Sequence, residues 1–133
     1  DGCLTRSPIK RHLRYGSVTE LPCHDRSVDV TSCIDTFQYL TRSEAKKAAS
    51  ELASVTRKYL CFEAITKEDK LSKQKENPDK LRRGKSLFTR NEYVKLFEDA
   101  GFTLVKRCFL PRKIEGSWYD YEFSFNAIFK LND

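Results

Sequence analysis

The fold class is decided by residues 27–65, which read SVDVTSCIDTFQYLTRSEAKKAASELASVTRKYLCFEAI. Residues 27–34 are short and rich in β-branched side chains, and residues 58–65 form a second apolar run, so both segments are typical of buried strands. The segment between them carries small alanines at helical spacing. A strand, a helix and a strand at this spacing predict a right-handed parallel crossover, and therefore an α/β fold.

Capping boxes mark the starts of two predicted helices. Thr41 with Glu44, and Thr89 with Glu92, have the spacing at which each side chain satisfies a free amide of the first turn. Gly101 is placed to end the second helix in a left-handed conformation. The apolar faces that follow the two starts are Ala45, Ala48, Ala49 and Leu52 for the first helix, and Tyr93, Leu96, Phe97 and Ala100 for the second.

The rest of the chain predicts a closing hairpin and one polar excursion. Residues 102–110 and 123–131 have strand composition, and the connection between them is too short for a crossover helix, so we expect an antiparallel pair. Residues 66–87 are nearly all charged or polar and predict a long surface loop or a short solvated helix. The expected architecture is one domain over residues 1–133: an incomplete Rossmann-like sheet with parallel strands, a closing antiparallel hairpin and flanking helices.

Composition restricts the environment of the protein. The 133 residues are 39% hydrophobic and 33% charged, and no apolar run approaches the ~20 residues that span a bilayer, so we expect no membrane segment. The five cysteines form no CxxC pair and have no histidine at metal-ligand spacing, which argues against a zinc site and favours reduced thiols in the cytoplasm. The first residues, DGCLTR, have no signal-peptide pattern and no initiator methionine, so we expect the chain to begin within a domain.

The charge balance leaves nucleic acid as an alternative partner. Lys and Arg outnumber Asp and Glu by 25 to 19, a net charge of +6 that favours acidic partners. The basic residues are mixed with acidic ones, as on an ordinary solvated surface, and no RNA-binding motif accompanies them.

Three motifs in order resemble a known family. Residues 15–30, YGSVTELPCHDRSVDV, are similar to a stretch in which a Gly-Asp-Ala-like turn precedes Leu-Pro, a polar loop and Phe-Asp. The helix ending ELASV at residues 51–55 resembles a Glu-Leu-x-Arg-Val ending, and residues 88–102 resemble a late segment that ends in Ala-Gly-Phe. From about residue 15 onward, the chain resembles the back half of a class I (Rossmann-like) S-adenosylmethionine-dependent methyltransferase domain.

The resemblance implies a cofactor crevice at the carboxyl ends of the parallel strands. Ser17 stands where the family often has an Asp that bonds the adenine amino group, and the backbone of Val18 would lie beside that ring. Cys33, Ile34 and Asp35 close the strand whose end faces the methionine part of the cofactor. These five residues are the expected contacts with S-adenosylmethionine.

Substrate contacts follow from the same resemblance. Phe37, Gln38 and Tyr39 occupy the next turn, which in relatives packs against cofactor or substrate. Trp118 and Tyr119 lie in the hairpin connection that often covers the substrate, with ordinary hairpin packing as the alternative. We assign no catalytic residue and no metal ligand, because transfer from an activated sulfonium depends chiefly on alignment.

One family motif is absent from the sequence. The glycine-rich first loop has no counterpart, because the five glycines are scattered singly. The chain is thus a fragment, is completed by another chain, or has lost catalysis. Our hypothesis is a methyltransferase-like domain of small-molecule type, and whether this chain is an enzyme by itself stays open. The alternative is a non-catalytic interaction module, completed at its sheet edge by a protein partner or a second copy.

Overall fold

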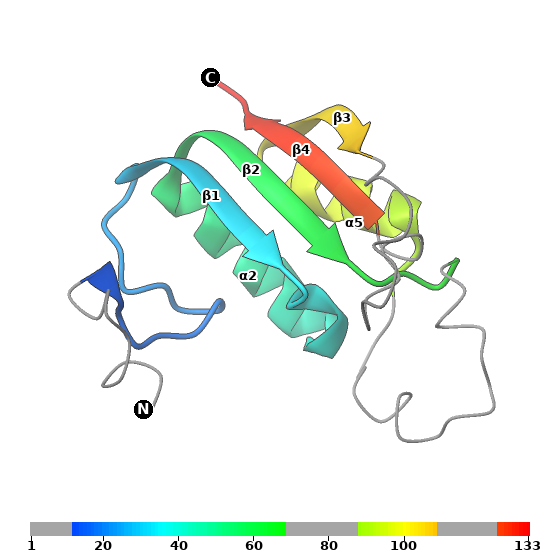
Figure 1. The fold of residues 1–133 in the computed structure, drawn as a ribbon, viewed down its shortest axis with the longest axis horizontal. Helices are drawn as coiled ribbons and strands as arrows, with labels where there is room; N and C mark the ends of the chain where they lie inside the picture. Colours follow the sequence, from blue (N-terminus) through cyan, green and yellow to red (C-terminus); the bar gives the residue numbers. More distant parts are fainter. Residues whose placement is uncertain (1–11, 69–87, 109–124) are drawn as a thin grey trace, which may run out of the picture.

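The computed structural model describes residues 12–68, 88–108 and 125–133. The described residues form one four-stranded sheet in the order β1-β2-β4-β3, with helices packed against it (Figure 1). In chain order the elements are β1 (Val28–Ile34), the short 3-10 helix η2 (Phe37–Tyr39), α2 (Arg42–Val55), β2 (Thr56–Ala64), α5 (Arg90–Asp99), β3 (Phe102–Cys108) and β4 (Phe125–Leu131).

The pairing of the strands confirms the predicted α/β class. β1 runs parallel to β2, with Cys33 beside Phe62, while β4 pairs antiparallel with both β2 and β3. The parallel crossover and the closing antiparallel pair are therefore both present. Residues 69–87, which include most of the predicted charged loop, lie outside the described residues.

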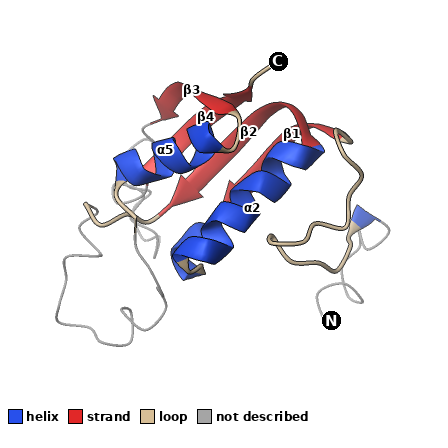
Figure 2. Cartoon of the chain, turned by 180° about the vertical axis from the view of Figure 1, so that it is seen from behind, coloured by secondary structure: helices blue, strands red, loops and turns tan. Residues whose placement is uncertain are grey.

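Both α-helices lie on the same face of the sheet, as Figure 2 shows from behind. Alternation along the strands places Cys33 and Leu60 under the helices, where they are buried. Val30, Ile34 and Tyr59 are exposed on the opposite face, at 53%, 55% and 39%. We call this opposite face, on which no described helix packs, the bare face.

The core lies between the sheet and the two helices and is rich in aromatic rings. The Phe62 ring is central, because its centroid lies 5.3 Å from that of Phe37, 5.1 Å from that of Tyr93 and 4.7 Å from that of Phe97. Each such side chain stabilises the fold by about 1.5–3 kcal/mol through burial. The turn after β1, the middle of β2 and α5 are thus joined in one cluster.

The helix starts confirm one capping box and correct the other. At α5, Thr89 accepts from the Glu92 amide, and the Glu92 carboxylate accepts from the Thr89 amide. At α2, Thr41 accepts from the Glu44 amide as predicted. The Glu44 carboxylate, however, accepts the Thr41 hydroxyl at 2.8 Å instead of the Thr41 amide, so the second half of that predicted box is wrong. Gly101 has φ +108°, as expected for a left-handed helix end.

β2 begins two residues earlier than predicted because α2 runs directly into it. The backbone amide of Thr56 and its hydroxyl both donate to the Leu52 carbonyl, the hydroxyl at 2.6 Å. The same hydroxyl lies 2.6 Å from that of Thr31 on β1. Thr56 therefore ends the helix, starts the strand and joins both to β1.

Candidate functional site

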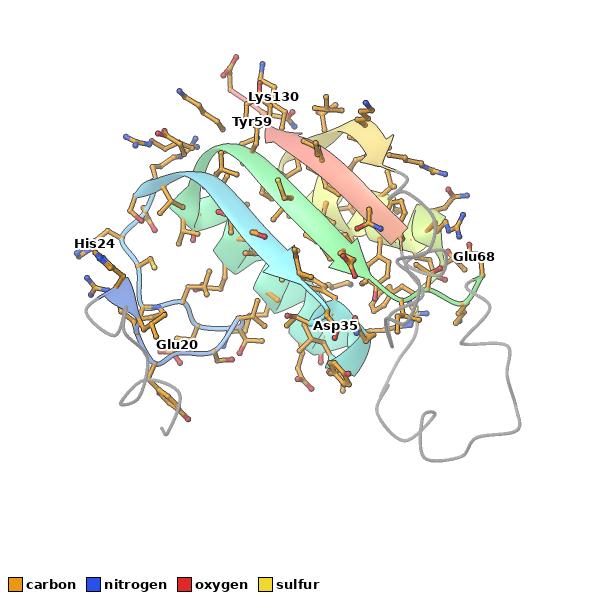
Figure 3. The ribbon with its side chains drawn as sticks, viewed as in Figure 1. Glu20, His24, Asp35, Tyr59, Glu68 and Lys130 are labelled. Atoms are coloured by element: carbon orange, nitrogen blue, oxygen red, sulfur yellow. The ribbon has the colours of Figure 1, made fainter. Side chains whose placement is uncertain are left out.

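The carboxyl end of β1 has an unusual backbone conformation. Asp35, the first residue after the strand, has φ +56°, and its amide donates to the Glu63 carbonyl at 3.1 Å. A left-handed conformation costs a non-glycine residue about 1–2 kcal/mol, and strain of this kind clusters at functional sites. Figure 3 shows Asp35 at this end of the sheet, and its side chain is exposed.

A buried amide holds the Asp35 carboxylate. Gln38 is only 3% exposed, and its Nε2 donates to Oδ1 of Asp35. Its Oε1 has no hydrogen-bond partner within the described part of the chain. A buried polar group without a partner lowers the stability of the folded state by about 1–3 kcal/mol. The buried position of Gln38 is therefore kept although its unpartnered Oε1 makes the fold less stable. The exposed carboxylate of Asp35 is thus held in place by the buried amide of Gln38.

The neighbouring turn residues divide into core and surface. Phe37 is completely buried, with its ring 5.3 Å from that of Phe97, so it supports the turn from inside. Tyr39 is 39% exposed and Ile34 is 55% exposed. Of the three predicted substrate contacts in this turn, only Tyr39 has an accessible ring.

Cys33 lies beneath this surface. Its side chain is 7% exposed, and burial raises the pKa of its thiol, while a hydrogen bond with Thr36 opposes the change. The thiol therefore stays protonated at neutral pH. Cys33 contributes packing at this position and not a nucleophile.

Ser17 and Val18 lie in a turn attached to α2. The Ser17 hydroxyl accepts from the Thr19 amide at 3.2 Å, and the Ser17 carbonyl accepts from the Glu20 amide at 3.0 Å. Val18 packs, partly buried, against the hydrophobic core. The Leu21 amide donates to the Glu51 carboxylate of α2 at 2.9 Å, which anchors the turn.

Gly16 is a residue of this segment that our sequence reasoning missed. A Cβ at position 16 would lie 2.5 Å from Cδ of Pro22, closer than any real contact. Only glycine therefore allows the proline ring to pack here. The sequence shows Gly16 and Pro22 within residues 15–30. It does not show that the two residues come into contact, because that contact depends on how the turn folds.

The structure brings some predicted residues together and separates others. Asp35 and Gln38 are in direct contact, whereas the Ser17 turn is bonded to α2, and no hydrogen bond between described residues joins it to Asp35. His24 is exposed in the segment before β1, and Figure 3 places it away from Asp35.

Further site predictions find no test among the described residues. Trp118 and Tyr119 lie outside them. In residues 12–68, 88–108 and 125–133, no three His, Cys, Asp or Glu side chains gather as a metal site would require. No helix in the same ranges has the length and apolarity needed to cross a membrane.

Comparison with known proteins gives matches at the level of structure. No protein-family model and no curated protein matches the sequence. Magnesium protoporphyrin IX methyltransferase from Synechocystis PCC 6803, solved with bound SAH, matches with a TM-score of 0.62 and 15% identity, over 88% of this chain and 49% of that one. An S-adenosylmethionine-dependent methyltransferase from Thermotoga maritima matches with a TM-score of 0.65 and 18% identity, over 88% and 62% of the two chains.

A third match comes from a complex. A chain of the Haloferax volcanii complex between the Trm112 methyltransferase activator and a methyltransferase matches with a TM-score of 0.62 and 17% identity, over 89% of this chain and 60% of that one. Across the three matches this chain spans between 49% and 62% of the length of the solved protein. The part of the chain that the structure describes therefore has the fold of class I S-adenosylmethionine-dependent methyltransferases, over about half of their length.

Proposed function

We propose that the carboxyl end of β1 forms one wall of an S-adenosylmethionine crevice in a methyltransferase domain. The observation that carries the proposal is the exposed Asp35 carboxylate, held by the buried Gln38 in a strained backbone at the end of a parallel strand. Ligands of open α/β sheets bind outside the carboxyl ends of the strands, where the strand order reverses. β1 is the outermost strand of the described sheet, so its free edge is the place for the strand that would complete the crevice.

The predicted contacts divide between two parts of the cofactor. We assign the methionine end to Ile34 and Asp35, with Cys33 packed beneath them, and the adenine end to the turn of Ser17 and Val18. Because the Ser17 hydroxyl already bonds within its own turn and carries no charge, it holds adenine less strongly than an Asp would.

Tyr39 is the accessible ring beside the reacting end, and we assign it to the methyl acceptor. The bound cofactor supplies an activated methyl group. Ile34, Asp35 and the turn of Ser17 would hold the cofactor, and an acceptor beside Tyr39 would receive the methyl group. The protein aligns cofactor and acceptor and excludes water. The glycine-rich wall has no counterpart in the sequence, so we propose that this chain alone binds weakly and needs a second wall for turnover.

A titration of the folded chain with S-adenosylhomocysteine, followed by ¹⁵N–¹H NMR, tests the binding proposal. We expect saturable shifts of the Ile34, Asp35 and Tyr39 amides at millimolar ligand. Methylthioadenosine, which lacks the amino-acid part, should move the Asp35 amide less. A folded chain whose β1 end shows no saturable shift would overturn the assignment.

Asp35→Asn separates the carboxylate from the backbone. Asn tolerates the left-handed conformation, so the fold should persist while the response at the end of β1 weakens. Glu98→Gln, which removes an exposed carboxylate from α5, serves as the control for loss of one negative charge. An unchanged response in Asp35→Asn would remove the carboxylate from the proposed site.

The second candidate function is an interaction module that uses the free edge of β1. It is favoured by the exposed apolar side chains Val30 and Ile34 along that edge. In this case Asp35→Asn leaves partner binding intact, whereas a methyltransferase loses affinity for its cofactor. In either case we place the chain in the cytoplasm, where the free thiols of Cys23, Cys33 and Cys61 stay reduced.

A further inference from the structure

We draw no further inference here: the strongest candidate, the strained turn after β1 in which the buried Gln38 amide holds the exposed Asp35 carboxylate, belongs to the site already described.

Discussion

The Nε2 of Gln38 donates to the carboxylate of Asp35, so a side chain in the core holds one at the surface. The contact spans the turn in which β1 ends and the chain turns toward α2. It couples the strained backbone of Asp35 to the aromatic cluster, because Phe37 in the same turn packs against Phe62 and Phe97. Rearrangement of this turn therefore requires the core to move.

The backbone of Asp35 predicts which substitutions it accepts. Asp35→Asn should leave the free energy of unfolding nearly unchanged, because Asn adopts a positive φ readily. Asp35→Val should lower it by about 1–2 kcal/mol, because a β-branched residue is strained there. Urea denaturation followed by circular dichroism measures both. Equal losses in the two variants would show that the carboxylate, and not the backbone, determines stability at this position.

The capping box of α5 predicts a dependence on acid. The hydrogen bond from the Thr89 amide, followed by smaller effects that include Arg42, lowers the pKa of Glu92 from its ordinary 4.5. A lowered pKa in the folded state means that the carboxylate stabilises the fold above pH 4.5, and that this stability is lost as pH falls through the folded value. Glu92→Gln should therefore be less stable than the unmodified chain at pH 7, and the difference should shrink in acid.

Urea denaturation at a series of pH values measures that difference. Glu98→Gln, which removes an exposed carboxylate from the same helix without touching the cap, is the control. The opposite outcome is a difference in free energy of unfolding between Glu92→Gln and the unmodified chain that stays constant from pH 7 into acid. That result would show that the geometry of the Gln side chain, and not the lost charge, destabilises the variant.

The central ring of the core predicts the largest loss of stability. Phe62 is 3% exposed, and Phe62→Ala should cost about 3–5 kcal/mol, a large part of the ~5–15 kcal/mol available to a domain. Tyr59→Ala, on the same strand but on the bare face, should cost much less. Phe62→Leu keeps part of the volume and gives a measurable transition if the alanine variant does not fold. Similar losses for Tyr59→Ala and Phe62→Ala would mean that the bare face is covered in solution.

The thiols predict an order of chemical reactivity. Burial raises the pKa of Cys33, whereas Cys23 is exposed. Because the thiolate is the reactive form, iodoacetamide at pH 7.5 should modify Cys23 before Cys33, with rates about tenfold or more apart. Mass spectrometry of the digested protein measures both rates, and urea should abolish the difference. Fast labelling of Cys33 in the folded chain would show that the end of β1 opens readily.

Much of the fold followed from local patterns in the sequence. The α5 start was predictable because Thr89 and Glu92 act within one turn, and the strands were predictable because burial alternates along β4 with period two. The boundary at Thr56 was missed because the helix end and the strand start share one residue. The second half of the cap at Glu44 was missed because the Thr41 hydroxyl competes for the same carboxylate.

The site was less predictable, because its geometry depends on distant residues. Phe37 was placed against the substrate from its position in the turn, but rings from α5, far along the chain, enclose it. Gln38 is a polar residue in a polar turn, and only the packing above it buries its amide. The positive φ of Asp35 has no marker such as glycine. The assignment of Asp35 to the cofactor came from resemblance alone and remains a prediction.

The position of β4 has a consequence for the order in which the protein can fold. β4 follows β3 in the chain but lies between β2 and β3 in the sheet. During synthesis, β1, α2 and β2 emerge before β3, and among the described strands β3 has no partner until residues 125–131 have been made. The nascent chain must therefore keep β3 and the outer edge of β2 unpaired for a time, and such edges are exposed to misassembly. Closure of the described sheet therefore waits for β4.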